Sequence, residues 1–277
     1  MSNGFKNVDE TRFGQYRRCI ENMADAVDDG TAEALLSDPQ SIEDLTDSMS
    51  EAFELRTIYQ ELGPRLDSEL RSRLKLFIKG PAAYRDERTG SSGNRPRNIG
   101  FELSMGALLL KFGFAIEFHP DGDLRFKHQG HEFFIECKRP QSKKQINSRV
   151  RDARDQLSNR YDEAADPAAA RGLIALSATK IANPAGKNLR TASLDSLGNG
   201  LAVYAEEFID ENRSKWRNPR DLRTLGCIVE LRAFVFVESA NPTTCVHLGM
   251  NNRNGLSRDD DRLFATIANQ IQQIRSS

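Results

Sequence analysis

The stretch DGDLRFKHQGHEFFIECKRP, residues 121–140, constrains the fold most, because it predicts two short strands joined by a tight turn. Gln129-Gly130 supplies that turn, since glycine readily adopts the positive φ that short hairpin loops require. Pairing outward from the turn sets Asp123 opposite Glu136. Directly opposed residues of an antiparallel pair share one face of the sheet. The register therefore predicts one apolar face and one charged face.

The apolar face of this hairpin collects five residues: Leu124, Phe126, Phe133, Ile135 and Cys137. The charged face collects Asp123, Glu136 and Lys138, with Asp121 opposite Lys138. Two facing carboxylates destabilise an ordinary sheet, but a divalent cation between them would stabilise the pair, because hard ions such as Mg²⁺ prefer carboxylate oxygens. A salt-bridged surface patch, neutralised by Lys138, explains the same residues. The hairpin alone leaves both interpretations open.

The rest of the chain predicts a helical part followed by a mixed α/β part. Residues 8–80 have the apolar spacing of helices, and a segment rich in Gly, Ser and Pro follows them. The order expected after this segment is helix, three strands, helix, strand. We therefore expect an N-terminal helical region (1–88), a linker (89–97) and an α/β domain (98–277).

Composition excludes few functions. The net charge is −1 over 277 residues, so any basic surface for nucleic acid must be local. No apolar run approaches the roughly 18 residues of a membrane span, and the first residues lack the apolar core of a secretion signal. The four cysteines show no zinc-binding or disulfide spacing. We expect a cytoplasmic protein without membrane contact.

Charge is distributed unevenly along the chain. Residues 20–54 contain eleven Asp or Glu and no Lys or Arg. This acidic segment predicts a solvated helical surface, or a surface that meets a protein partner or a second copy of the chain. Residues 138–160 are instead basic, with eight Lys or Arg against two Asp. One hypothesis is that the acidic segment shields this basic helix from nucleic acid.

Asp123 at the start of one strand and the E-x-K triplet Glu136-Cys137-Lys138 on the next resemble the PD-(D/E)xK nuclease superfamily, whose fold is restriction-endonuclease-like. The likeness spans residues 97–179. The literal Pro-Asp pair is formed by Asp121 with the proline before it, but Asp123 leads directly into the alternating strand. Asp123 is therefore the favoured ligand and Asp121 an auxiliary candidate.

The resemblance implies a metal-dependent nuclease that hydrolyses phosphodiester bonds with Mg²⁺ or Mn²⁺. It implies metal ligation by Asp123, Glu136, the backbone carbonyl of Cys137 and Glu102, a carboxylate on the preceding helix. Lys138 would orient the attacking water, so Asp123, Glu136, Lys138 and Glu102 are the expected catalytic residues. Gln156 on the following helix is an auxiliary candidate, because Gln156 and Tyr161 resemble the Gln–Tyr pair of some family members, although they are five residues apart here rather than four.

The substrate implied by the resemblance is nucleic acid, DNA rather than RNA, in a setting such as restriction or phage defence. Phosphate contacts are expected from the basic segment after the triplet: Arg139, Lys143, Lys144, Arg149, Arg151 and Arg154. A solvated helix with i,i+4 ion pairs accounts for the same arginines. The alternative function is a catalytically silent member of the fold that binds nucleic acid or a protein partner.

Overall fold

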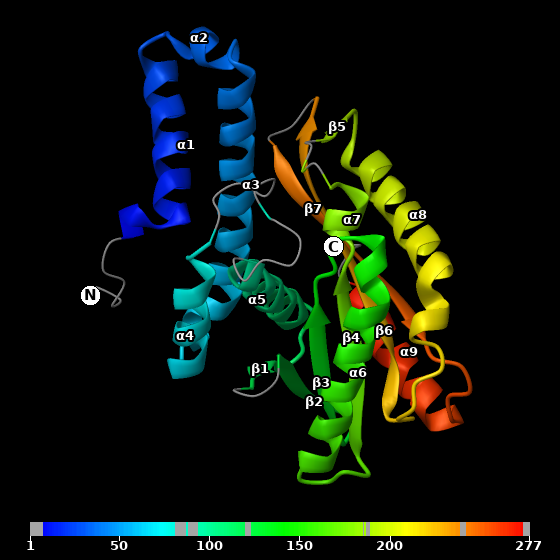
Figure 1. The fold of residues 1–277 in the computed structure, drawn as a ribbon. Coiled ribbons are helices and arrows are strands. Elements are labelled where there is room, and N and C mark those ends of the chain that lie inside the picture. Colours follow the sequence, from blue (N-terminus) through cyan, green and yellow to red (C-terminus); the bar gives the residue numbers. More distant parts are fainter. Residues whose placement is uncertain are drawn as a thin grey trace.

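The structure, a computed structural model, describes residues 8–80, 87, 94–119, 123–184, 186, 189–238 and 242–273. A mixed sheet of seven strands forms its centre, with helices on both faces (Figure 1). The N-terminal helices stand together beside one end of this sheet. The expected mixed α/β class is confirmed. Within the described part of the chain, no helix is long and apolar enough to cross a membrane.

The longer helices are α1 (Arg12–Asp28), α3 (Pro39–Leu62), α4 (Ser68–Phe77), α5 (Arg95–Lys111), α6 (Ile146–Glu163), α8 (Leu194–Asn212) and α9 (Arg258–Gln273). Two short helices are α2 (Ala32–Leu36) and α7 (Thr179–Ala182). The strands are β1 (Glu117–Phe118), β2 (Leu124–His128), β3 (His131–Lys138), β4 (Ala170–Ser177), β5 (Leu189–Thr191), β6 (Thr224–Val237) and β7 (Thr243–Asn252).

The first three strands pair antiparallel, and β4 then pairs parallel with β3 after the α6 crossover. β6 continues the parallel part, and β7 closes the sheet antiparallel to β6. The expected order of helix, three strands, helix and strand is thus present in α5, β1–β3, α6 and β4. Their arrangement brings the carboxyl ends of β3 and β4 to one edge of the sheet, where open α/β sheets bind ligands.

Two boundaries differ from the sequence expectation. α5 begins at Arg95, inside the expected linker, because Pro96 suits the first turn of a helix. The rest of that linker, residues 89–93, lies outside the described residues, and so does Asp121. The segment FAIEF, residues 114–118, predicts a strand, but β1 covers only Glu117–Phe118. The backbone N–H groups of Phe114 and Ile116 donate to the carbonyls of Leu109 and Phe114 instead of to a neighbouring strand. The sequence also did not predict β5 or α7.

Each face of the sheet has its own core. On one face α5 and α9 pack against the apolar side of the hairpin, where Phe126 and Phe133 stack with ring centroids 5.0 Å apart. On the other face α6 and α8 cover β3, β4 and β6, and Phe134 packs edge-on to Tyr161 of α6. Both faces of β3 are therefore buried, as expected of a strand that joins a parallel sheet.

The N-terminal helices share a core with α5. Ile58 and Leu62 of α3 pack in one cluster with Leu103 and Ala107 of α5. α3 packs most closely on α1, and outside the N-terminal helices it packs on α5 and β7, whereas α6 packs on β3 and β4 on the far side of the sheet (Figure 1). The acidic segment therefore does not shield the basic helix, contrary to that hypothesis. The expected division at residues 88–98 stays a prediction, since this core joins the two parts.

Candidate active site on the hairpin

The hairpin has the predicted register. Leu124 pairs with Ile135, and His128 pairs with His131 across the turn. Gln129 and Gly130 both have positive φ, at 48° and 80°, as the tight turn requires. All five residues of the predicted apolar face lie in the core beneath α5 and α9. This outcome confirms that the hairpin has an apolar face and an opposite, charged face, on which the site depends.

Asp123 directly precedes β2, and its side chain is tied to the neighbouring strand. The backbone N–H of Cys137 donates to Asp123 Oδ2 at 2.5 Å. The N–H and C=O of one residue point to the same side of a strand, so the carbonyl of Cys137 also faces Asp123. The Cys137 side chain points into the core instead, and burial raises the pKa of its thiol well above the usual value. Cys137 can thus contribute a carbonyl oxygen but not a nucleophile.

Lys138 joins the two carboxylates of the hairpin. Its Nζ lies 2.9 Å from Glu136 Oε2 and 3.7 Å from Asp123 Oδ2. Glu136 is only 2% exposed, and the Lys138 side chain is 14% exposed. α6 and its neighbours cover this face, so the cluster is not the solvated surface patch that the sequence left open. Burying these charges is costly unless they are closely paired and hydrogen-bonded.

Glu102 of α5 reaches the same cluster and is held by an arginine from the N-terminal helices. Arg73 of α4 forms an ion pair with Glu102 and also donates to the carbonyl of His119 at 2.7 Å. The Arg73 guanidinium lies over the Phe118 ring at 5.6 Å. The sequence did not identify Arg73, because its partners lie 29 and 46 residues further along the chain.

The electrostatics show that the three carboxylates act on one another. Burial and the charge of Asp123 raise the pKa of Glu136 to about 7. Burial, Asp123 and Glu136 raise the pKa of Glu102 to about 8, against the opposing effects of Arg73 and Lys138. Burial lowers the pKa of Lys138, but the charges of Asp123 and Glu136 outweigh this effect, so the pKa lies above its usual value. Carboxyl groups that share a desolvated site with an ammonium are typical of acid–base and metal chemistry.

α6 presents one flank to this cluster. Gln156 and Arg160 are four residues apart and therefore lie on the same side of the helix. The charge of Arg160 lowers the pKa of Glu136, so this guanidinium acts electrostatically on the cluster. Arg160 Nη1 pairs with Glu163 at 3.1 Å, while its buried Nε has no hydrogen-bond partner among the described residues. Helical spacing from Gln156 could have identified Arg160 from sequence.

Tyr161, the expected companion of Gln156, belongs to the core. It is fully buried, and its hydroxyl lies 2.9 Å from Thr224 Oγ1 at the start of β6. The Tyr161 side chain therefore stabilises the packing of α6 on the sheet. Gln156 remains exposed on the flank of α6 that faces the carboxylates.

The basic residues after the Glu136-Cys137-Lys138 triplet differ in whether a protein carboxylate already neutralises them. Arg139 is buried, and its two terminal nitrogens lie 2.9 and 3.0 Å from the two oxygens of Glu87, so it is committed to a structural ion pair. Lys143 pairs with Glu211 at 2.9 Å on the surface. The others lie on or beside the first half of α6: Lys144, Arg149, Arg151 and Arg154. Arg149 makes an exposed pair with Asp152 at 3.6 Å, and Arg154 donates to two backbone carbonyls. None of these four is held in a buried ion pair with a described residue, as Arg139 is, so a phosphate backbone can still reach them.

The chemistry of the donor set fits a hard divalent cation, since Asp123, Glu136 and Glu102 supply carboxylate oxygens beside the Cys137 carbonyl. Over the described ranges, however, no group of three or more His, Cys, Asp or Glu side chains is already arranged around a common centre. The carboxylates instead pair with Lys138 and Arg73. Binding a cation would require these side chains to turn from their ammonium and guanidinium partners.

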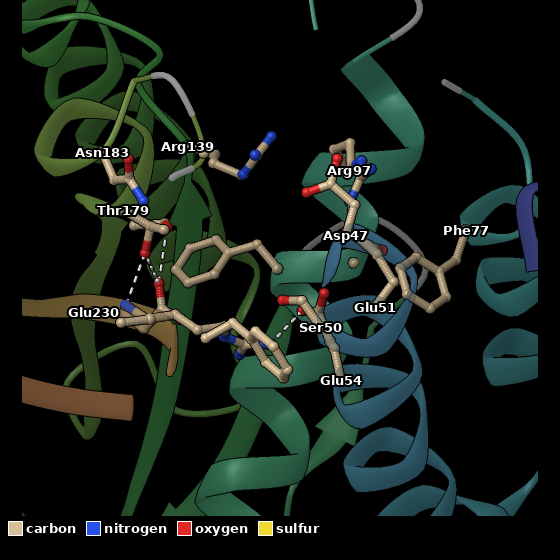
Figure 2. A pocket seen from close by; sticks show the side chains of 17 residues that line it. Asp47, Ser50, Glu51, Glu54, Phe77, Arg97, Arg139, Thr179, Asn183 and Glu230 are labelled. Carbon is tan, nitrogen blue, oxygen red and sulfur yellow. Dashed lines mark hydrogen bonds and ion pairs between the residues drawn. The ribbon is translucent and has the colours of Figure 1, made fainter. Parts of the chain in front are cut away.

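A separate polar cavity of about 100 Å³ lies where α3 and α5 meet the carboxyl edge of the sheet. In Figure 2, Glu51 and Glu54 of α3 face Thr179 and Glu230 across it. Glu230 accepts from Ser177 at 2.8 Å, and Arg232 links Glu230 to Glu54 at 3.1 and 2.7 Å. None of the hairpin carboxylates lines this cavity. Its ion pairs fasten the N-terminal helices to the sheet.

Comparisons with protein-family models, with characterised proteins and with solved structures find no match to this chain. Its function is therefore inferred from the side chains and their geometry.

Proposed function

We propose that this chain is a metal-dependent nuclease with a restriction-endonuclease-like core, acting on DNA. The observation that carries the proposal is the position of Lys138, whose Nζ lies within 4 Å of the carboxylates of both Asp123 and Glu136. The three residues occupy the strand positions of the D…ExK motif. The antiparallel β1–β3 unit between α5 and α6 also agrees with the order of that fold.

In the proposed site Asp123, Glu136 and Glu102 hold Mg²⁺ or Mn²⁺ together with the carbonyl of Cys137. The cation supplies charge stabilisation at the phosphate when it is bound. Lys138 then becomes free of its carboxylate partners, orients a water molecule and offsets negative charge on the phosphate. Arg160, which already acts electrostatically on Glu136, stands on the α6 flank where a phosphate oxygen would approach.

The alternative is a silent member of the fold that binds nucleic acid or a protein partner. One observation favours it: Lys138 and Arg73 already pair with Glu136 and Glu102, so these carboxylates have partners of opposite charge within the protein itself. Against it, burial raises the pKa of Glu136 and Glu102, which means that keeping these two carboxyl groups ionised in the buried site costs free energy. A silent protein has no need to maintain such a cluster.

The test is cleavage of linear DNA, circular DNA and RNA with Mg²⁺, with Mn²⁺ and with a chelator. The variants Asp123→Ala and Lys138→Ala should both lose metal-dependent cleavage. Lys127→Ala, an exposed lysine on the same hairpin, and Asp259→Ala, an exposed aspartate on α9, are the matched controls and should keep it. If the folded wild-type protein cleaves none of these substrates with either metal, the nuclease proposal fails. The alternative function, binding of nucleic acid or a protein partner without cleavage, then takes its place.

A further inference from the structure

A groove of about 390 Å³ runs along α6 on the flank turned away from the carboxylates. Its walls are α6 between Asn147 and Ser158 and the segment from Pro219 to Thr224, which leads into β6. One stripe of α6 is buried against the sheet, and it consists of Ile146, Val150, Ala153, Leu157 and Tyr161. By helical spacing, Arg151 and Arg154 lie to one side of this buried stripe, and Gln156 and Arg160 lie to the other. The groove and the carboxylate cluster are therefore separated by the body of α6.

Three arginines converge on this groove. Arg154 is held in place by the carbonyls of Lys215 and Asn218, to which its terminal nitrogens donate at 3.3 and 2.8 Å. Arg151 and Arg220 are exposed, and neither makes a hydrogen bond or an ion pair with any described residue. Burial and the charge of Arg220 lower the pKa of Arg154, so the guanidinium groups repel one another. Like charges gathered in one groove are costly until an anion neutralises them.

The acidic residues of the groove do not neutralise these arginines. Asp221 pairs with Arg223 at 2.6 Å and accepts a hydrogen bond from Ser158 at 3.2 Å. Asp155 is exposed, and its charge favours the protonated form of Arg154 only partly. The groove thus keeps an excess of positive charge. Guanidinium groups bind phosphate oxygens bidentately and are well suited to this ligand.

The length of the groove indicates more than one phosphate. Asn147 and Ser158 are eleven residues apart, which corresponds to roughly 16 Å along a helix. Phosphates recur every 3.4 Å or so along one strand of a B-form duplex. An anion the size of a single phosphate would contact only part of this surface. The spacing therefore favours a polyanionic backbone over a free phosphate ester.

We infer that this groove binds the phosphate backbone of a nucleic acid, through Arg151, Arg154 and Arg220, apart from the site of cleavage. The inference rests on the proposed function and extends it, because it names the surface that retains the substrate. It also gives a role to the segment before β6, for which the sequence indicated none.

The test compares two double variants of the full-length protein. Arg151→Gln/Arg220→Gln removes two groove arginines that pair with none of the residues that the structure describes. Arg71→Gln/Arg190→Gln removes two exposed arginines on α4 and β5, and is matched in charge. Binding to a labelled 30-base-pair duplex is measured with a chelator between 50 and 200 mM salt. The groove variant should bind about tenfold more weakly, and the slope of log K against log[salt] should fall by about 2, since each lost contact contributes ~0.9.

Two outcomes overturn the inference. The first is a salt slope that is the same in both double variants, because the arginines then act only through net charge. The second is a millimolar AMP or inorganic phosphate titration that raises the thermal midpoint of the wild type but not of the groove variant, with DNA binding unchanged. That result would identify a small phosphate ester as the ligand.

Failure of the nuclease proposal gives a different pattern. In that case the wild type cleaves nothing with Mg²⁺ or Mn²⁺, yet the two double variants still differ in salt slope. If the wild type cleaves DNA but both double variants bind it alike, only the groove is excluded.

Discussion

Lys138 donates a hydrogen bond of 2.9 Å to Glu136, which lies two positions earlier on the same strand. Residues two apart on a strand share one face, so this pair follows directly from the local backbone. What distinguishes the pair is its burial beside a second carboxylate, Asp123, 3.7 Å from the same ammonium. A divalent cation entering here would compete with Lys138 for both carboxylates.

The first prediction concerns metal binding without reference to cleavage. Mg²⁺ or Mn²⁺ should raise the thermal midpoint of the wild type by several degrees, because a ligand at 100 times its Kd stabilises the folded state by about 2.7 kcal/mol. Glu136→Gln should abolish the increase. Glu132→Gln, on the same face of β3 and paired with Arg125 at 3.4 Å, is the control and should retain it. An equal increase in all three proteins would locate the cation elsewhere.

The second prediction is the pH dependence of the metal-free protein. The pKa values of about 7 for Glu136 and about 8 for Glu102 lie above the ~4.3 of an unfolded glutamate. Between these limits the folded state holds protons that the unfolded chain releases. The contribution of Glu136 and Glu102 to the free energy of unfolding is therefore fully present below about pH 4, and it is lost as the pH rises toward 8. The stabilisation by Mg²⁺ should grow over the same range, since its ligands must be deprotonated.

Thermal midpoints between pH 5 and 8 in a chelating buffer check this dependence. The double variant Glu102→Gln/Glu136→Gln should show a flatter profile than the wild type, whereas Glu132→Gln should keep the wild-type profile. Identical slopes in the wild type and the double variant would show that these carboxyl groups have ordinary pKa values.

The third prediction separates Arg139 from the residues that contact phosphate. Among the described residues, Arg139→Ala leaves the buried carboxylate of Glu87 with only Arg97, whose Nε lies 3.5 Å away. Losing one member of a buried pair costs up to about 3–5 kcal/mol of unfolding free energy, so we expect a loss at or below the lower end of this range. Urea unfolding measures this loss. Removing both partners, in Arg139→Ala/Glu87→Ala, should cost less than removing Arg139 alone. Lys143→Ala, which breaks an exposed pair, should change stability little.

A destabilised but folded Arg139→Ala protein should keep the salt slope of DNA binding at low temperature. A slope reduced by about one would instead assign Arg139 to a phosphate contact.

The fourth prediction concerns the N-terminal helices. Deleting residues 1–88 removes Ile58, Leu62 and their neighbours from the core that they share with Leu103, and it leaves Arg97 without Glu51. The truncated chain should therefore aggregate or lose its near-ultraviolet circular dichroism, rather than gain DNA affinity. A soluble, folded truncation with stronger DNA binding would contradict this and support a regulatory role for the helices.

Point variants test the same core in the full-length chain. Leu62→Ala and Leu103→Ala, from the two sides of the core, should each lower the free energy of unfolding by about 2–5 kcal/mol. Tyr59→Ala, at a neighbouring position that is 70% exposed, is the control and should have a small effect. Equal effects at all three positions would show that this core does not hold the two parts together.

The sequence by itself determined the hairpin: its turn at Gln129-Gly130, its register, and the separation of Cys137 from Glu136 and Lys138. These features follow from the two-residue period of a strand and from the backbone freedom of glycine, which act over a few neighbouring residues. The same local reasoning indicated the order of helices and strands around the hairpin.

Only the tertiary structure decided which charges are free. It paired Arg139 with Glu87, placed Arg73 on Glu102, and buried Glu136 under α6. It also set Arg220 beside Arg154, although the two are far apart in the chain. The partner of a long charged side chain depends on which elements pack together, and that packing is a property of the whole sheet and its helices. Local periodicity places a side chain on a face, and only the assembled fold decides what it meets there.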